Sequence, residues 1–360
     1  MTIIKLANGL IRSKLTGSPF YSHYYVTRRC YFKCRMCSIW KYGDKNEEPG
    51  LDVIEKIADK MSRMNLINVV FTGGEPFIRK DLPEIVKIFT RKGINVRIQT
   101  TGAPNISDDM IKETISAGVK HMTVSLDTLD KAKQDEICQS KNLWDSAVRV
   151  IKLAIKSLPK GVVVVNTVVT RKNYAELPQI VKFVTSLGAF SSFVPVHLVK
   201  RPEIENPIRA FYDEFNFNES DIPELRKVYH ELIDMKRDGY SIGSSTRFLK
   251  DSLETIISGN QKWKCDAGKY YFVVYPDGSV ALCDDFPAKW NILDPTFIEK
   301  FRSLETKKEI NKMIASCPGC IYGCWRETSY ILSRPSVLFE QTKNFGKRLI
   351  FGTNNKKRIE

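Results

Sequence analysis

Near its start the chain contains Cys30-Tyr-Phe-Lys-Cys34-Arg-Met-Cys37, a C-x3-C-x2-C pattern. The first residues show no secretory signal, so such close cysteines indicate metal binding rather than disulfides. Three thiolates on one loop can hold three irons of a [4Fe-4S] cluster and leave the fourth iron open for a substrate or cofactor. Structural zinc is the alternative, but it needs four ligands, and His23 is the only further candidate nearby.

A predicted helix, a strand and a glycine-rich turn follow these cysteines. Apolar residues recur on one helical face over residues 51–64, and residues 67–71 are typical of a buried strand. The strand runs into Thr72-Gly73-Gly74-Glu75-Pro76. Two glycines at the carboxyl edge of a strand let backbone approach a ligand closely. The Glu75 carboxylate supplies an acceptor for an ammonium group.

Six strand-like runs alternate with helical runs through the first two-thirds of the chain. We expect strands at residues 24–27, 69–72, 96–100, 121–126, 162–169 and 192–198. We expect the intervening helices at residues 51–64, 82–92, 107–117, 143–157 and 174–187. This alternation predicts an α/β fold, with a parallel sheet covered by helices. Catalytic and ligand-binding residues of parallel barrels lie at the carboxyl ends of strands, and both motifs follow such strand ends.

Cys30, Cys34 and Cys37 together with Gly73-Gly74-Glu75-Pro76 closely resemble the signatures of the radical S-adenosylmethionine (SAM) superfamily. The resemblance is strong over residues 20–200 and implies a partial (β/α)6 TIM-like barrel. It implies a [4Fe-4S] cluster whose open iron chelates the amino and carboxylate groups of SAM. Reductive cleavage of SAM then yields a 5′-deoxyadenosyl radical that abstracts a substrate hydrogen atom. A low-potential electron donor such as flavodoxin or ferredoxin is implied as a partner.

Polar residues at other strand ends are further candidates for SAM contact. The resemblance assigns the amino group of SAM to Glu75, and the ribose or methionyl part to Ser125 and Asp127. Each such residue can instead cap the next helix. The complete predicted set beyond the cysteines is Gly73, Gly74, Glu75, Pro76, Thr100, Ser125, Asp127, Asn166 and Arg171.

A second group of cysteines lies near the end of the chain. Residues 270–275 and 279–282 are expected to form a hairpin, because Pro276-Asp277-Gly278 joins two strand-like runs. The pattern Cys-x12-Gly-x4-Cys with a later Cys-x2-Cys resembles the SPASM/twitch domains of many radical SAM enzymes, a small α+β unit. It implies one auxiliary [4Fe-4S] cluster, with zinc as the alternative. The candidate ligands are Cys265, Cys283, Cys317, Cys320 and Cys324.

Five cysteines exceed the four that a cluster needs, so the ligand set stays open. The twitch resemblance favours Cys317 and Cys320 beside Cys265 and Cys283, which leaves Cys324 as a spare thiol. The ninth cysteine, Cys138, is isolated and is interpreted as a plain buried or half-buried thiol.

The charge is concentrated at the chain ends. The 360 residues hold 56 Lys+Arg against 41 Asp+Glu, a formal net charge of +15. Residues 1–29 carry five basic and no acidic side chains, and residues 341–360 carry six against one. Both ends show amphipathic helical patterns. We expect a basic segment at 1–20, the barrel at 21–200, bridging helices at 201–260, the auxiliary domain at 261–330 and a basic helix at 331–360.

The sequence thus predicts a radical SAM enzyme whose substrate is unknown. The basic ends suggest a lipid or other large apolar substrate, and peripheral contact with an anionic membrane at its inner face. The alternative is an enzyme that modifies peptides or small metabolites. A non-enzymatic iron–sulfur electron carrier or zinc-binding protein is disfavoured by Gly73-Gly74-Glu75. A cytoplasmic location is expected, because no apolar run reaches the ~18 residues of a membrane span, and no nucleic-acid motif is present.

Overall fold

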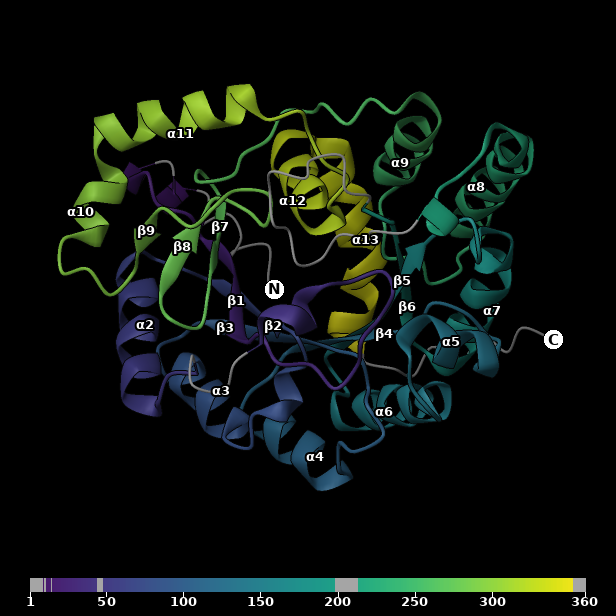
Figure 1. Ribbon diagram of the computed structural model, residues 1–360, viewed down its shortest axis with the longest axis horizontal. Coiled ribbons are helices and arrows are strands. Elements are labelled where there is room, and N and C mark those ends of the chain that lie inside the picture. The colour runs from purple at the N-terminus through teal and green to yellow at the C-terminus, as the bar shows by residue number, and fades with distance from the viewer. Residues whose placement is uncertain (1–8, 10, 14, 44–47, 198–212, 352–360) are drawn as a thin grey trace.

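The fold is built on one nine-stranded sheet (Figure 1). The computed structural model describes residues 9, 11–13, 15–43, 48–197 and 213–351. The strand order is β6-β5-β4-β3-β2-β1-β7-β8-β9, and the first six strands along the chain are parallel. Those six are β1 (Tyr21–Thr27), β2 (Asn68–Gly73), β3 (Asn95–Thr100), β4 (His121–Ser125), β5 (Val162–Val169) and β6 (Phe190–Pro195).

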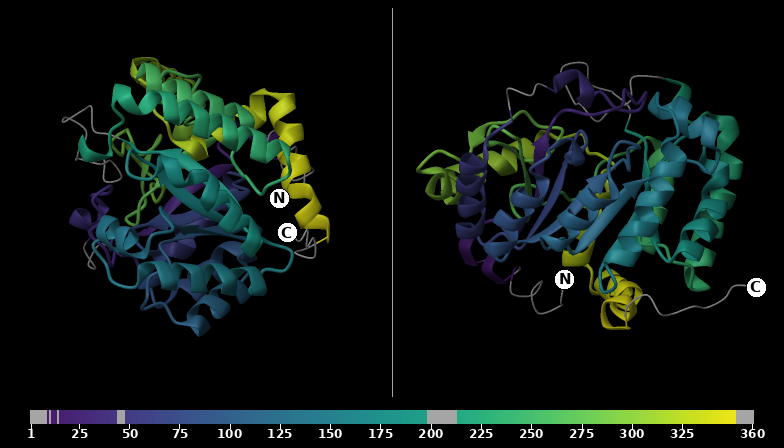
Figure 2. Two further views of the ribbon diagram at one scale, coloured as in Figure 1. Left: turned by 90° about the vertical axis from the view of Figure 1, so that its right-hand side faces the viewer. Right: turned by 90° about the horizontal axis from the view of Figure 1, so that it is seen from below.

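Helices follow the strands and cover the outer face of this curved sheet, as Figure 2 shows from two sides. They are α2 (Leu51–Arg63), α3 (Leu82–Arg91), α4 (Asp108–Ser116), α5 (Lys131–Cys138), α6 (Leu143–Ser157) and α7 (Leu177–Leu187). On the outer face Tyr24 of β1 and Phe71 of β2 pack against Phe89 of α3. The burial of such aromatic and branched side chains between sheet and helices is what stabilises the layers.

The predicted α/β architecture, a parallel sheet covered by helices, is therefore confirmed. The predicted hairpin is also present, as β7 (Tyr271–Val274) and β8 (Ser279–Ala281), joined by a turn in which Gly278 has a φ of +83°. It is extended by the short strand β9 (Trp290–Asn291). The hairpin does not form a sheet of its own, because β7 pairs in parallel with β1. This pairing satisfies the backbone groups at the β1 edge of the barrel.

The C-terminal helices close over the inner side of the sheet. Trp325 of α12 (Gly323–Ser333) is 1 % exposed and stacks on Tyr271 of β7, with ring centroids 4.5 Å apart. It also contacts His23 of β1, on the opposite side of that strand from Tyr24 and α3. In Figure 1 the yellow helices α12 and α13 (Pro335–Phe351) lie between the β7–β9 strands and β6.

The remaining helices are α8 (Ile222–Arg237), α9 (Thr246–Ser258), α10 (Phe297–Arg302) and α11 (Leu304–Ser316). Short 3-10 turns stand at Ile39–Tyr42, Pro76–Ile78, Tyr174–Glu176, Asp213–Phe215 and Glu219–Asp221, labelled η1, η3, η4, η5 and η6. In the described part of the chain, no helix is both long and apolar enough to span a membrane.

The two predicted basic ends differ in what the structure describes. Most of the amphipathic pattern at residues 3–11 lies outside the described residues, as do residues 198–212 of the bridge and residues 352–360. The C-terminal helix α13 begins at Pro335 and packs on the fold. Phe345 lies against Phe190 of β6 with ring centroids 4.7 Å apart, and Gln341 donates a hydrogen bond to the Gly243 carbonyl. The apolar side chain of Phe345 therefore faces the protein.

Candidate active site

The cysteine loop leaves the carboxyl end of β1 and is anchored at its base and its tip. At the base, the Arg29 guanidinium forms a bidentate ion pair with the Glu48 carboxylate, with N–O distances of 2.7 and 2.8 Å. At the tip, the backbone N–H of Arg35 donates to the Ile137 carbonyl at the end of α5, 3.0 Å away. The Arg35 side chain pairs with Glu214 at 2.6 Å. The loop is thus held just before Cys30 and again between Cys34 and Cys37.

Cys30, Cys34 and Cys37 lie together on this loop, and all three are partly exposed. Burial raises the pKa of the Cys30 and Cys37 thiols, that of Cys37 to about 12. The pKa of Cys34 is raised by the neighbouring Cys138 thiol and by burial, and electrostatic interactions join Cys34 to both of the other cysteines. Iron binding must therefore displace protons, since the thiolate is the ligand. Among the described residues no three His, Cys, Asp or Glu side chains could hold a single ion. A [4Fe-4S] cluster instead takes one thiolate per iron, which three thiols on an anchored loop fit.

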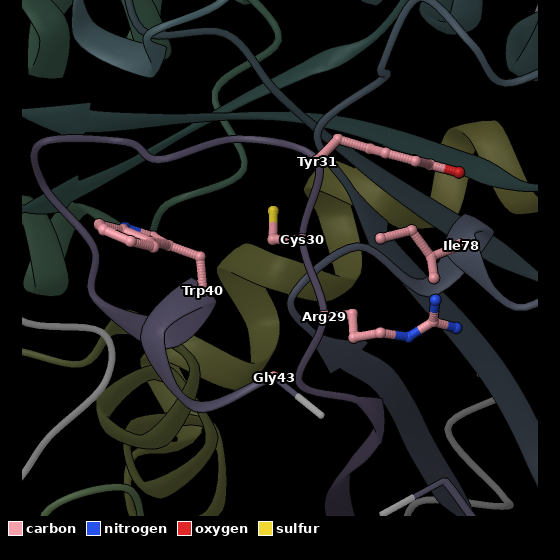
Figure 3. A pocket seen from close by; sticks show the side chains of 6 residues that line it. All are labelled: Arg29, Cys30, Tyr31, Trp40, Gly43 and Ile78. Atoms are coloured by element: carbon pink, nitrogen blue, oxygen red, sulfur yellow. The ribbon is translucent and has the colours of Figure 1, made fainter. Parts of the chain in front are cut away.

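A cavity of about 410 Å³ opens beside Cys30 (Figure 3). Its lining consists of Arg29, Cys30, Tyr31, Trp40, Gly43 and Ile78. In Figure 3 the Cys30 thiol lies between the Trp40 ring on one side and Tyr31 and Ile78 on the other. The indole N–H of Trp40 donates to the Cys37 carbonyl at 3.0 Å, which fixes the ring against the cysteine loop. The cavity offers aromatic and cationic surface next to Cys30, a predicted cluster ligand.

The Gly73-Gly74 pair lets the end of β2 lie directly against the start of the cysteine loop. A Cβ on Gly73 would stand 1.9 Å from the Thr27 carbonyl oxygen, and one on Gly74 would stand 1.9 Å from that of Arg29. Gly73 has a φ of +127°, which L-residues rarely adopt. The next N–H groups, of Gly74 and Glu75, donate to those same carbonyls at 3.1 and 2.8 Å. The glycines therefore fix the loop through backbone contact, in addition to any approach to a ligand.

Glu75 is fully buried and joins the ends of β2 and β3. Its carboxylate accepts hydrogen bonds from the Thr101 N–H at 2.7 Å, the Thr101 hydroxyl at 2.5 Å and the Phe77 N–H at 3.1 Å. The Thr100 hydroxyl donates to both carboxylate oxygens, at 2.8 and 3.0 Å. Desolvation by burial raises the pKa of Glu75, and these donors oppose that rise. The carboxylate is thus held in place, with Thr100 as a supporting residue and buried Pro76 opening the next turn.

Ser125 and Asn166 are brought side by side, because they are direct partners in the register of β4 and β5. Asp127, just beyond β4, is buried, and its carboxylate accepts from the Val168 N–H at 2.8 Å. Desolvation raises the pKa of Asp127 to about 6. An electrostatic interaction also joins Asp127 to Cys34. Ser125 and Asn166 are partly exposed and remain candidates for SAM contact, whereas the Asp127 carboxylate links β4 to β5.

Arg171 lies beyond β5, and its side chain is 42 % exposed. It pairs with the Asp221 carboxylate at 3.1 Å, and its backbone N–H donates to the Phe215 carbonyl. Its contacts thus tie the β5 end to residues 213–221. The predicted SAM contact of Arg171 stays a prediction.

The second group of cysteines gathers around Cys320. Electrostatic interactions join Cys320 to Cys265, Cys283 and Cys324, and join Cys265 to Cys317. Burial raises the pKa of the Cys320 thiol to about 12. The Cys265 thiol is also 3.3 Å from the Tyr271 hydroxyl. The fold therefore brings all five predicted cysteines into one region beside β7.

This second region adjoins the first through β1. The Tyr25 hydroxyl of β1 donates to the Asp284 carboxylate at 2.5 Å, next to Cys283. Desolvation raises the pKa of Asp284 to about 6. Farther across the sheet, His197 beyond β6 stacks on Tyr322 with ring centroids 3.9 Å apart. The second cysteine region thus lies beside β1, the strand that leads into the cysteine loop.

Three features of the site were not predicted from the sequence. Trp40 follows Cys37 by three residues, but a single aromatic residue in a loop carries no pattern. Arg97 of β3 donates to the Thr123 hydroxyl at 2.9 and 2.5 Å, on the inner face of the sheet. Helix α5 has few apolar residues, so its sequence shows no clear helical pattern. The feature that could have predicted its start is the N-cap Asp130, whose carboxylate accepts from the Lys133 N–H.

Comparisons with known proteins agree with this geometry. The model of the radical SAM superfamily matches residues 24–184. The chain is 27 % identical over 223 residues to a tungsten-containing aldehyde ferredoxin oxidoreductase cofactor-modifying protein of Pyrococcus furiosus, covering 60 % of this chain and 62 % of that protein. It is 28 % identical over 175 residues to a PqqA peptide cyclase of Bradyrhizobium diazoefficiens, covering 48 % of this chain and 45 % of the cyclase.

A solved structure shows the same fold. Streptococcus suis SuiB bound to S-adenosylmethionine superposes with a TM-score of 0.64 over 92 % of this chain and 79 % of SuiB, at 16 % identity. The aligned part of the chain covers less than two-thirds of the length of the Pyrococcus and Bradyrhizobium proteins. The fold, the cysteine loop and the family match converge on one assignment. Residues 24–184 of this chain form a radical SAM domain.

Proposed function

We propose that the protein is a radical SAM enzyme that carries two iron–sulfur clusters and acts on a polar substrate. When bound, a [4Fe-4S] cluster and SAM supply a one-electron cleavage of the SAM carbon–sulfur bond, which gives methionine and a 5′-deoxyadenosyl radical for hydrogen-atom abstraction. The observation that carries the proposal is the anchored loop of Cys30, Cys34 and Cys37, beside a cavity of about 410 Å³.

Each named residue has a task in this proposal. The three thiolates hold three irons, and the Arg29–Glu48 ion pair keeps the loop closed at its base. Glu75 accepts a hydrogen bond from the amino group of SAM, and the Thr100 and Thr101 hydroxyls turn to make room for that donor. Ser125 and Asn166, paired across β4 and β5, contact the sugar or methionyl part. Trp40 and Tyr31 shield the cavity beside Cys30 from water.

The second cysteine region supports an auxiliary [4Fe-4S] cluster of the twitch kind. Cys265, Cys283 and Cys320 are central to it, because Cys320 interacts electrostatically with both of the others. The fourth ligand is either Cys317 or Cys324. The position of this auxiliary cluster beside β1 supports a role in binding the substrate, or in accepting the electron left when a substrate radical is oxidised. A cytoplasmic site and a flavodoxin or ferredoxin donor remain part of the proposal.

The inner face of the barrel favours a polar substrate over a lipid. Arg97 and Thr123 are hydrogen-bonded to each other there. Asn166 pairs in register with Ser125 on one side and with Ser192 on the other, so all three project from the same face. Such a surface leaves few apolar contacts for an acyl chain. The curated relatives, named for modifying a cofactor or cyclising a peptide, support a peptide or small polar metabolite.

The lipid hypothesis depended on two basic amphipathic ends. The described part of α13 packs Phe345 on Phe190, so that this helix serves the fold. We therefore expect the protein to stay in the supernatant when vesicles of an anionic phospholipid are sedimented. Co-sedimentation that is lost on removal of the ends would restore the lipid hypothesis.

Anaerobic reconstitution tests the proposed reaction. Wild-type protein with iron, sulfide, SAM and dithionite should form 5′-deoxyadenosine, and Cys34→Ala should form none. The chain offers Glu84→Gln as a control, since Glu84 is an exposed residue of α3 outside both cysteine groups. Formation of 5′-deoxyadenosine at the wild-type rate by Cys34→Ala would contradict the proposal.

Iron content tests the second cluster. The variant with Cys30, Cys34 and Cys37 all changed to Ala should retain about four irons per chain, the content of one [4Fe-4S] cluster. Wild type should hold about eight. Complete loss of iron from the triple variant would show that the second cysteine region holds no cluster. Zinc in place of iron would show the alternative metal.

A further inference from the structure

Arg326 of α12 is a buried arginine beside the second cysteine region. It is only 2 % exposed. Its guanidinium donates to two neutral groups, the Thr255 hydroxyl at 3.2 Å and the Gln261 carbonyl at 3.0 Å. It also lies over the Trp263 ring, 5.6 Å from the centroid. The Nε atom of Arg326 is buried and has no hydrogen-bond partner among the described residues.

The acidic groups around this arginine are engaged elsewhere. Helix α9 supplies one of the acceptors and lies beside α12 (Figure 1), but its Asp251 pairs with Arg247 at 2.8 Å. Glu327 follows Arg326 on α12, and its carboxylate accepts from the Ser245 N–H at 2.6 Å. Within the described ranges, no carboxylate forms an ion pair with Arg326. A buried charge is costly unless an anion lies nearby, so these surroundings suit an anionic partner.

Arg326 lies next to the backbone that carries a proposed ligand of the auxiliary cluster. The Gln261 carbonyl that accepts from Arg326 also accepts from the Cys320 N–H, at 3.1 Å. The backbone is closely packed at this point, since a Cβ on Gly319 would stand 1.9 Å from the same oxygen. Cys320 in turn interacts electrostatically with Cys265. The guanidinium and the Cys320 backbone are thus joined through one shared acceptor.

A [4Fe-4S] cluster is an anion of the kind that this arginine lacks, because its four thiolates outweigh the positive charge of the iron–sulfur core. Reduction adds one more negative charge, so a fixed cation nearby stabilises the reduced state more than the oxidised one. We propose that Arg326 supplies a counter-charge to the auxiliary cluster and raises its reduction potential. This inference rests on the proposed function, in which the second cysteine region holds that cluster.

Two substitutions separate the charge of Arg326 from its hydrogen bonds. Arg326→Gln removes the charge and keeps an amide donor, whereas Arg326→Lys keeps the charge and loses the planar fork of donors. Arg334→Gln is the matched control. Arg334 is an exposed arginine at the end of the same helix, over the Tyr330 ring, where water and salt screen its charge.

The test is a redox titration of the reconstituted full-length protein, followed by electron paramagnetic resonance. The signal to follow is the one that SAM leaves unchanged, which separates the auxiliary cluster from the SAM-binding cluster. Arg326→Gln should lower the equilibrium constant for one-electron reduction about tenfold, equivalent to about 59 mV. Arg326→Lys should show less than half of that decrease in potential, and Arg334→Gln should match wild type.

Each result supports or overturns the role of Arg326. An unchanged potential in Arg326→Gln overturns the inference, and so does an equal decrease in Arg326→Lys or Arg334→Gln. If Arg326→Gln fails to retain the second cluster, the lysine variant decides: a potential close to that of wild type supports the inference, and loss of the cluster overturns it.

Failure of the proposed function gives a different result. A wild-type protein that shows no signal besides the SAM-responsive one contradicts the proposed auxiliary cluster itself. A wild type with both signals and an unaffected Arg326→Gln variant refutes only the role of Arg326.

Discussion

Replacing Glu75 with glutamine tests whether this carboxylate has a structural role in addition to its proposed contact with SAM. One carboxylate oxygen accepts from the Phe77 N–H, and the other accepts from the Thr101 N–H. An amide group must direct its N–H₂ toward one of these two backbone donors, whichever way it turns. Backbone N–H groups cannot turn to accept, so at least one buried N–H loses its partner.

The magnitude follows from that lost partner. An unsatisfied buried donor costs about 1–3 kcal/mol, and loss of a hydrogen bond to a charged acceptor costs about 1.5–3 kcal/mol. Removing a desolvated carboxylate, whose pKa is raised by burial, offsets part of this loss. We expect Glu75→Gln to lower the free energy of unfolding by about 2 kcal/mol.

Urea titration under anaerobic conditions measures this change, and calorimetric titration measures SAM binding in the same preparations. Glu84→Gln is the matched control, because Glu84 is an exposed residue of α3 and should change stability by less than about 0.5 kcal/mol. We expect Glu75→Gln to weaken both stability and SAM binding. A variant as stable as wild type that no longer binds SAM would refute the structural role of the Glu75 carboxylate.

Three further changes follow from the same geometry. Trp325→Ala empties a fully packed site between α12 and the sheet, and should lower the free energy of unfolding by about 3–5 kcal/mol in urea titration, with a smaller loss counting against that packing. The exposed Lys33 and Lys41 stand over the Trp40 ring beside the cysteine loop. Changing both lysines to Glu should slow reduction by flavodoxin and leave reduction by dithionite unchanged. Equal slowing of both reactions would contradict docking of the electron donor at these lysines. Burial raises the pKa of Glu327 from 4.5 to about 7, so its contribution to stability is complete below pH 4.5 and is lost as the pH rises through 7. The free energy of unfolding should therefore change less between about pH 5.5 and 8 in Glu327→Gln than in wild type. An equal change in both proteins would refute the raised pKa of Glu327.

The barrel could be predicted because its signals are local. The valine-rich run at 162–169 is buried on one face and half-buried on the other, and the three apolar residues at 69–71 are all buried, so both segments are mainly hydrophobic. The cysteine spacing and the Gly-Gly-Glu-Pro turn are short local patterns that lie at or directly after the ends of β1 and β2. Local pattern and final position agree, because the carboxyl ends of parallel strands meet at one edge.

What escaped prediction depends on contacts between distant residues. The pairing of β7 with β1 joins residues about 250 positions apart, and no local pattern encodes a strand's partner. Helix α5 was missed because Lys131–Cys138 presents few apolar residues and little amphipathic pattern. Its burial comes from Ile137 and Cys138 at one end, where it meets the cysteine loop. Arg171 likewise finds Asp221 only because residues 213–221 fold back over the β5 end.

The central claim, that SAM binds at a cluster held by Cys30, Cys34 and Cys37, is tested most directly by electron paramagnetic resonance of the dithionite-reduced protein before and after SAM is added. The proposal predicts that SAM changes the signal of one cluster in wild type, and that Cys34→Ala shows no such change. A wild-type signal that SAM leaves unaltered, or one that still responds after the loss of Cys34, would contradict the assignment of this loop as the site of the reaction.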